Sequence, residues 1–163
     1  MIKVGDRLPE ATFKVMTPDG PANRTTNEIF GGKKVVLFGV PGAFTPTCHR
    51  NHLPGYLENL DTLRSKGIDS IVCVAVNDVF VLDAWAKSSG AQGRIEFLSD
   101  GNAEFTRAIG LSLDASGFGM GTRSQRYAML VDDGVVKSIN VEDAPSKADI
   151  SSAASMMKVL EAA

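Results

Sequence analysis

The sequence predicts an α/β protein with a mixed central sheet flanked by helices. Strand-like and helix-like segments alternate through the first two thirds of the chain, which favours parallel strands joined by helices. Two later strand segments, 126–131 and 135–141, are joined by Asp-Asp-Gly at 132–134. Because Asp-Gly is a strong hairpin signal, the last part of the sheet is expected to be antiparallel.

Two apolar runs predict the central strands of this sheet. Lys34–Val40 and residues 69–76 are continuous and rich in β-branched side chains, as expected for strands buried on both faces. Between them, apolar residues from 53 to 63 recur with a period near 3.6, which predicts a helix that begins after Pro46 and ends near Gly67.

The remaining segments are shorter and give the order strand, helix, strand, helix, strand, helix, hairpin, helix. Residues 1–32 are expected to be rich in loops, with a turn at 18–20 where Pro is followed by Asp and Gly. The other expected elements are a weak strand at 11–16, a helical turn at 26–30, a helix at 78–87, a strand at 95–98, a helix at 102–109, a glycine-containing loop at 111–122 and a helix from about 150 to 160.

Length and composition limit the class of protein. The chain has 163 residues, of which 44% are hydrophobic and 22% charged, and no linker or repeat divides it. We therefore expect one globular domain over residues 1–163. The net charge of −2 gives no electrostatic reason to expect binding to nucleic acid or to an anionic membrane surface.

The amino terminus and the cysteine content bear on the compartment. The chain starts without an apolar signal segment, and its longest apolar runs are too short to span a bilayer. Two cysteines, Cys48 and Cys73, are too few for a disulfide-stapled scaffold. These features predict a cytoplasmic protein and raise the question of whether either thiol is reactive.

Cys48 lies where chemistry is expected, between a buried strand and the helix that follows it. Ligand crevices form at the carboxyl ends of strands, and the free N–H groups of a first helical turn favour an anion such as a thiolate. The alternative is a small apolar cysteine that fills the interface between helix and sheet. Pro54 lies within the helical pattern and predicts a kink there.

The stretch around this cysteine resembles a known family. Pro41-x-x-x-Thr45-x-x-Cys48 matches the active-site motif of peroxiredoxins, and Pro-Gly-Ala-Phe-Thr-Pro-Thr-Cys at 41–48, followed by His-Leu-Pro-Gly at 52–55, looks like the peroxiredoxin-5 subfamily. The similarity covers nearly the whole chain and includes Arg-Tyr-Ala-Met at 126–129. The resemblance implies a thioredoxin-like fold.

The resemblance also implies a set of catalytic residues. Cys48 would be the peroxidatic cysteine, and Thr45 would hydrogen-bond both the thiolate and the peroxide oxygens. Pro41 would shield the site from water, and Arg126 would hold the thiolate and polarise the peroxide. The backbone N–H groups of Cys48 and Thr47 would complete the pocket, where fixed donors stabilise charge on the leaving oxygen.

Further candidates lie in the same stretch. Gly42, Phe44 and His52 join Thr47 as expected substrate-binding residues; His52 is also expected to support the active-site loop by hydrogen bonding, whereas His49 is expected to be solvated. Phe44 has core packing or an interface as its alternative role. Cys48 and His52 are four residues apart, but further ligands for a closed metal site are not evident, so neither a metal nor an organic cofactor is expected.

The second cysteine bears on the reductant. Cys73 lies in an apolar strand and is expected to be buried and inert, with a role as the resolving cysteine as the alternative. That alternative would bring its Cα within about 7 Å of that of Cys48. Animal members of the subfamily carry a resolving cysteine near the carboxyl terminus, whereas no cysteine follows Cys73 here.

The expected function is therefore reduction of hydrogen peroxide and alkyl hydroperoxides through a Cys48 sulfenic acid. Glutathione, glutaredoxin or thioredoxin would serve as the external reductant, and the resemblance implies a homodimer. A thiol-based sensor remains an alternative, separated from an enzyme by continuous turnover. A disulfide oxidoreductase is disfavoured because the chain has no Cys-x-x-Cys.

Overall fold

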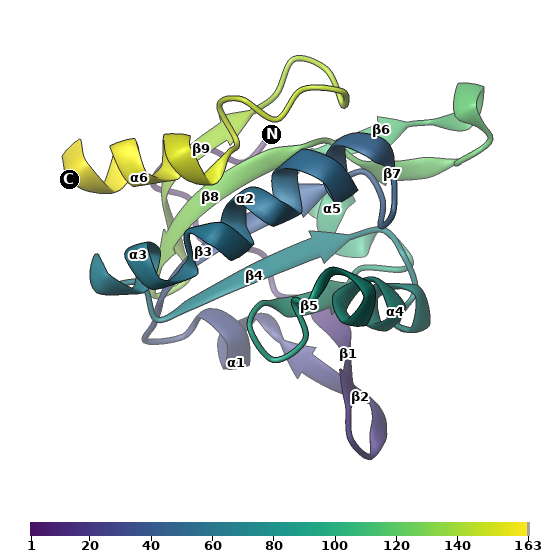
Figure 1. Cartoon of the computed structure of the whole chain (residues 1–163), viewed down its shortest axis with the longest axis horizontal. Coiled ribbons are helices and arrows are strands. Elements are labelled where there is room, and N and C mark those ends of the chain that lie inside the picture. The colour runs from purple at the N-terminus through teal and green to yellow at the C-terminus, as the bar shows by residue number, and fades with distance from the viewer. Residues whose placement is uncertain (163) are drawn as a thin grey trace.

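The computed structural model describes residues 1–162 as a central sheet with helices on both faces (Figure 1). In chain order the elements are β1 (Thr12–Thr17), β2 (Gly20–Thr25), α1 (Thr26–Phe30), β3 (Lys34–Val40), a π-helical turn (Cys48–His52), α2 (Leu53–Glu58), α3 (Leu60–Ser65), β4 (Ser70–Ala75), α4 (Val79–Ser89), β5 (Glu96–Ser99), α5 (Glu104–Ala108), β6 (Ser112–Asp114), a 3-10 turn (Ser116–Phe118), β7 (Thr122–Ser124), β8 (Tyr127–Asp132), β9 (Val135–Val141) and α6 (Ala153–Ala162).

The main sheet has seven strands in the order β2-β1-β5-β4-β3-β8-β9. Strand β4 runs parallel to both β3 and β5, whereas the pairs at either side are antiparallel. The predicted mixed sheet is confirmed. None of the helices among residues 1–162 is long and apolar enough to cross a membrane.

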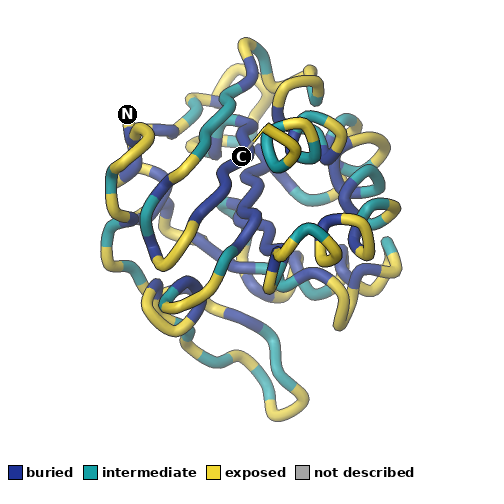
Figure 2. Tube along the Cα trace, turned by 90° about the vertical axis from the view of Figure 1, so that its left-hand side faces the viewer, coloured by how far each residue is buried: buried dark blue, intermediate teal, exposed yellow. Residues whose placement is uncertain are grey.

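Alternation along the central strands divides the core into two parts. Phe38 and Cys73 face a cluster formed with α2, α3, α4 and α6, whereas Leu37 and Val74 face a second cluster formed with α1 and α5. Figure 2 shows the buried segments through the middle of the molecule, with exposed residues at turns and on the outer sides of helices. The first of these faces carries the candidate site.

Two regions expected to be rich in loops contain hairpins. The weak strand expected at 11–16 is confirmed as β1, and the predicted turn joins it to β2, which was not expected. Residues 111–122 include most of the β6–β7 hairpin. The loop prediction for 111–122 was wrong because Gly119 and Gly121, both at positive φ, allow the chain to reverse between two short strands. Phe118, at the tip, is 81% exposed.

The predicted helix after Pro46 is divided into several pieces. The backbone N–H of Leu53 donates to the Cys48 carbonyl, the longer span of a π turn, and helical backbone angles continue through His52 and Leu53 into α2. Pro54, which has no N–H to donate, lies directly after this wider turn. The helix breaks at Asn59, whose side-chain amide donates to the Gly55 carbonyl. The irregularity expected at Pro54 therefore lies on either side of it.

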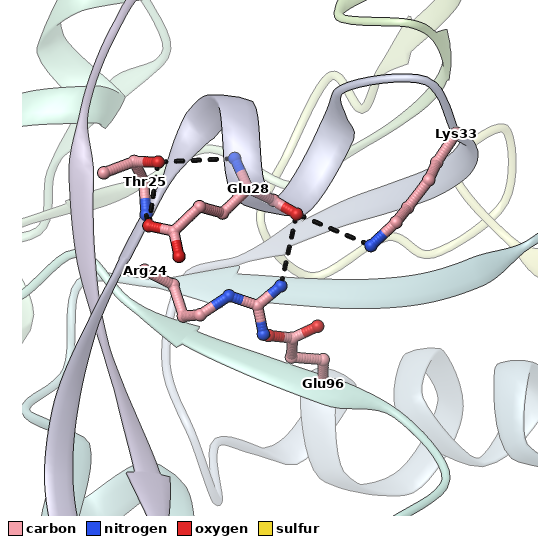
Figure 3. A network of polar contacts seen from close by, with 5 residues as sticks. All are labelled: Arg24, Thr25, Glu28, Lys33 and Glu96. Atoms are coloured by element: carbon pink, nitrogen blue, oxygen red, sulfur yellow. Dashed lines mark hydrogen bonds and ion pairs between the residues drawn. The ribbon is translucent and has the colours of Figure 1, made fainter.

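A polar network ties α1 to the edge of the sheet (Figure 3). Thr25 and Glu28 form a capping box at the start of α1, each side chain bonding the other residue's backbone N–H. Arg24 pairs with Glu96 of β5 at 2.7 Å and also donates to the Glu28 carbonyl, as does Lys33. The β1–β2 hairpin is thereby joined to the rest of the sheet at its outer strand.

Candidate active site

Cys48 lies at the junction of strand and helix predicted for it. The chain leaves β3 at Val40, becomes helical from Pro46, and enters the π turn at Cys48. The side chain points into the core beneath α2 and is fully buried, with 0% exposure. Since the sulfur lies in the first helical turn, the backbone geometry there favours an anion.

Arg126 reaches this sulfur from the neighbouring strand. It directly precedes β8, which pairs with β3, and alternation from Ala128 places it on the same face as Cys48. Its Nη2 donates to the Cys48 Sγ at 2.8 Å, and Arg126 as a whole is 2% exposed. A buried guanidinium at this distance stabilises negative charge on the sulfur.

The guanidinium makes three further contacts. Its Nε and Nη2 donate to the Pro145 carbonyl at 3.1 and 3.0 Å, and its Nη1 lies 2.8 Å from the Nδ1 of His52. Because arginine has five N–H donors, these contacts leave one N–H on Nη1 for a further acceptor. Arg126 is therefore held in one orientation, and one N–H on its Nη1 is not used by these contacts.

The loop between β3 and the π turn is closed by its own hydrogen bonds. The hydroxyl of Thr45 donates to the Gly42 carbonyl at 2.6 Å, and the Ala43 N–H donates to Asn77 Oδ1 at 2.9 Å. Among the described residues, the Thr45 hydroxyl makes no hydrogen bond to the Cys48 sulfur, unlike the contact that the resemblance implies. Asn77 was missed by sequence reasoning, because its position after β4 carries no local signal.

Pro41 and Gly42 are buried at the start of this loop. A Cβ on Gly42 would come within 3.2 Å of both Arg123 Nη1 and Thr45 Cγ2, so a larger residue would need these side chains to shift by a few tenths of an ångström. Thr47 is half-buried, and its hydroxyl donates to the Ser146 carbonyl at 3.2 Å. Thr47 thus connects the loop to a distant segment of the chain.

Phe44 and His49 form part of an aromatic group on the outer side of the loop. Phe44 has a φ of 63°, is 46% exposed, and its ring lies 5.7 Å from that of His49 and 6.5 Å from that of Trp85. The Nε1 of Trp85 donates to His49 Nδ1 at 3.0 Å. The expectation that His49 is solvated is wrong, because this contact holds the ring half-buried against α4.

His52 is buried beside Arg126. Since a guanidinium only donates, Nδ1 of His52 must accept, and Nε2–H then donates to the Ser151 carbonyl at 2.9 Å. Burial, reinforced by the Arg126 charge and opposed by the Ser151 carbonyl, lowers the pKa of His52 to about 3. The neutral ring therefore supports the guanidinium, and at 1% exposure it offers no surface to a substrate.

Cys73 is equally buried but lies in the middle of β4, where its register partners are Phe38 and Phe97. Burial raises the pKa of the Cys73 thiol well above its ordinary value, with nearby Cys48 adding to the effect and Arg126 opposing it. Its predicted burial is confirmed, and both cysteines are free. Within residues 1–162 no group of three or more His, Cys, Asp or Glu side chains is placed to hold a metal ion.

Comparison with known proteins agrees with this geometry. The Redoxin family model matches residues 3–157. A chloroplastic peroxiredoxin-2E-2 from Oryza sativa subsp. japonica is 50% identical over 98% of this chain and 72% of its own length. The chain belongs to the peroxiredoxins. Peroxiredoxin-2B from Arabidopsis thaliana is 43% identical over 98% of both chains.

Solved peroxiredoxins share the fold as well as the sequence. Reduced Prx3 from Vibrio vulnificus in complex with H2O2 has a TM-score of 0.93 and 50% identity, covering 98% of this chain and 99% of that one. Peroxiredoxin 5 from Alvinella pompejana has a TM-score of 0.88 and 36% identity over the full length of both chains. This peroxiredoxin therefore has the expected thioredoxin-like fold and is a thiol-dependent peroxidase with an antioxidant function.

Proposed function

We propose that Cys48 is the peroxidatic cysteine and that Arg126 activates it. The observation that carries this proposal is the 2.8 Å contact between Arg126 Nη2 and Cys48 Sγ inside the core. The thiolate attacks the terminal peroxide oxygen and the O–O bond breaks. The other oxygen takes up the proton that the thiol released on ionising and leaves as water or an alcohol. The sulfur becomes a sulfenic acid.

The surrounding groups supply donors for the leaving oxygen. The remaining N–H on Arg126 Nη1 and the hydroxyl of Thr45, once turned from the Gly42 carbonyl, would bond the peroxide oxygens, with the N–H groups of Thr47 and Cys48 beside them. Such donors stabilise the charge that develops as the O–O bond breaks. Pro41 and Gly42, both buried, keep bulk water away from the sulfur, and the substrates proposed are hydrogen peroxide and alkyl hydroperoxides.

The proposed cycle uses one cysteine of the chain. An external thiol condenses with the sulfenic acid, releasing water and forming a mixed disulfide, and a second thiol displaces Cys48 and restores the thiolate. Support for this route comes from the position of Cys73, whose strand is paired on both sides and whose ionisation is suppressed by burial. Glutathione, glutaredoxin and thioredoxin are the reductant classes proposed.

Mass spectrometry tests the proposed resolution step. After one equivalent each of hydrogen peroxide and glutathione, the wild type and Cys73→Ser should both carry glutathione on Cys48. An intramolecular Cys48–Cys73 disulfide in the wild type would overturn the one-cysteine cycle. Peroxide consumption with glutathione–glutaredoxin and with thioredoxin, measured side by side, then identifies the preferred reductant.

The proposal extends to the assembly and the compartment. Phe44, Phe80 and Phe118 are exposed apolar side chains that fit a homodimer interface, and two free cysteines fit the reducing environment of the cytoplasm. Sedimentation should therefore show a dimer at micromolar concentration, and a monomer there would refute the assembly. A single domain over residues 1–163 is part of the same proposal.

A further inference from the structure

After β9 the chain returns to the site and contacts it at several points. This return segment, residues 142–152, begins where the Glu142 N–H donates to the Arg126 carbonyl at 2.9 Å. The Pro145 carbonyl accepts from the Arg126 guanidinium, and the Ser146 carbonyl accepts from Thr47. One segment therefore contacts both the activating arginine and the loop that precedes Cys48.

Inside the return segment, a buried chain of hydrogen bonds leads away from the guanidinium. The Ser151 carbonyl accepts from His52 Nε2 and from the Tyr56 hydroxyl, at 2.9 and 2.8 Å. The Ser151 N–H and hydroxyl both donate to Glu142 Oε2, at 2.8 and 2.6 Å. Ser151 is fully buried, and Glu142 is 8% exposed.

The chemistry of the two ends sets the direction of every bond in this chain. The Arg126 guanidinium can only donate and the Glu142 carboxylate can only accept, so each group between them donates toward the carboxylate. The reversed tautomer of His52 would set an N–H against the guanidinium and a lone pair against the Ser151 carbonyl. The chain thus permits one neutral tautomer and one ring orientation.

Burying the Glu142 carboxylate costs free energy, because an ionised group loses its hydration in the core. No ion pair involving Glu142 is present in the described part of the chain. Its negative charge instead ends a line of donors that begins at Arg126. The Ser151 N–H and carbonyl belong to successive peptide groups, so the carboxylate acts on the guanidinium by fixing the position of the Ser151 carbonyl that orients His52.

We propose that Glu142 is a positioning residue for peroxide reduction, holding Arg126 on the Cys48 sulfur through Ser151 and His52. The inference rests on the proposed roles of Cys48 and Arg126. Glu142 does not touch the reacting atoms. It holds the Ser151 residue in place, the Ser151 carbonyl orients the His52 ring, and the ring orients the guanidinium.

The central experiment compares Glu142→Ala with Asp143→Ala. Asp143 is the exposed neighbouring carboxylate, so the two variants lose the same group from adjacent positions. Rapid quench with an alkylating agent and mass spectrometry gives the second-order rate of Cys48 oxidation by hydrogen peroxide. We expect Glu142→Ala to lower this rate about 10- to 100-fold, the range that small misplacement of a catalytic group produces, and Asp143→Ala to retain it.

The nitrogen NMR shifts of His52 provide a readout that a purely structural role would not change. The wild type should show a single neutral Nε2–H tautomer, whereas Glu142→Ala should show a mixture of tautomers. Glu142→Gln, which keeps an acceptor oxygen for Ser151, should recover most of the rate and the single tautomer. Equal rates in Glu142→Ala and Asp143→Ala would overturn the proposal, as would a slower Glu142→Ala with an unchanged His52 spectrum.

Two further variants cover the remaining outcomes. Should Glu142→Ala fail to fold, Ser151→Ala removes only one donor to the carboxylate and should slow oxidation about fivefold, the effect of one hydrogen bond; an unchanged rate would reject the proposal. Arg126→Gln separates this inference from the function on which it rests. A slow Arg126→Gln with a normal Glu142→Ala refutes the positioning role alone, whereas a normal Arg126→Gln refutes the proposed activation itself.

Discussion

The two cysteines of this peroxiredoxin are equally buried and share one core cluster, yet their surroundings differ in kind. Cys48 lies in a π turn after the end of β3 and accepts a hydrogen bond from Arg126. Cys73 lies in the middle of β4, paired on both sides by β3 and β5. Cys48 therefore has a charged donor, whereas no hydrogen bond reaches the Cys73 sulfur within the described residues.

Burial alone therefore does not decide whether a thiol reacts. Removing a thiol from water disfavours its ionised form, and at Cys73 this effect outweighs the opposing charge of Arg126, so the pKa of that thiol is raised. At Cys48 a guanidinium and a first helical turn face the sulfur in the same low-dielectric interior, where such contacts are strong. The same burial therefore suppresses ionisation of the Cys73 thiol and strengthens the contact between Arg126 and the Cys48 sulfur.

The strongest test of the difference between the two cysteines is to remove each sulfur in turn. Cys48→Ser should lower peroxide turnover about a thousandfold or more, because the nucleophile is lost. Cys73→Ser should keep most of the activity. Peroxide consumption with an excess of thiol measures both variants, and comparable losses in the two would contradict the division of roles.

Replacing the donor should bring the reactivity of Cys48 closer to that of Cys73. Arg126→Gln should reduce the rate of peroxide reaction about 100- to 1000-fold, as when a charge-stabilising donor is removed from an active site. Arg126→Lys should not restore the rate, because an ammonium lacks the planar fork that bonds several acceptors at once.

Arg123→Gln is the matched control for that substitution. Arg123 is half-buried three residues earlier, and its Nε donates to the Met120 carbonyl. Its loss should change the rate by less than about threefold, the scale of a single exposed contact. Stopped-flow kinetics with hydrogen peroxide measures all three arginine variants, and equal losses at 123 and 126 would remove the special status of Arg126.

Acid should lower the free energy of unfolding through protonation of His52, which lies beside Arg126. The folded pKa of about 3 lies below the ordinary value of 6.5, so the unfolded chain binds a proton over that interval and the folded chain does not. The contribution of His52 to the free energy of unfolding is complete above pH 6.5. It falls by at most about 1.4 kcal/mol for each unit of pH toward 3. Urea unfolding at several pH values should show a shallower decline for His52→Asn, and an unchanged one for Cys73→Ala.

The smallest expected effect is on the stability contributed by Cys73. Cys73→Ala leaves a small cavity in a well-packed strand, and should cost about 1–2 kcal/mol of unfolding free energy. Peroxidase activity should stay within about twofold of the wild type. Denaturant unfolding and turnover, measured on the same preparation, check both values; a large loss of turnover without unfolding would assign Cys73 a chemical role.

Local patterns predicted much of the fold. The continuous apolar runs identified β3 and β4, and the Asp-Gly turn identified the β8–β9 hairpin, because both signals depend on neighbouring residues. The β6–β7 hairpin was missed because its strands are three residues long and too short for a detectable alternation. Nothing in the local sequence explains the glycine at position 39. In the fold the Tyr127 ring lies across it, and a Cβ there would collide with that ring.

Some residues of the site were likewise marked by the local sequence and others were not. A motif within a few residues placed Cys48 and Thr45, and the resemblance added Arg126 from the far end of the chain. No such signal marked Glu142 or Ser151. Ser151 meets His52 from 99 residues away in the sequence, and Glu142 meets Ser151 inside an irregular segment.

By itself, the sequence determined the alternation of strands and helices, the two buried central strands, and the position of Cys48 at a strand-to-helix junction. These follow from periodicity and turn chemistry, which act over a few residues. Only the tertiary structure decided that Arg126 meets the Cys48 sulfur, that His52 is a neutral support, and that the return segment anchors both. Those outcomes depend on sheet register and on burial, which arise when distant parts of the chain pack together and exclude water.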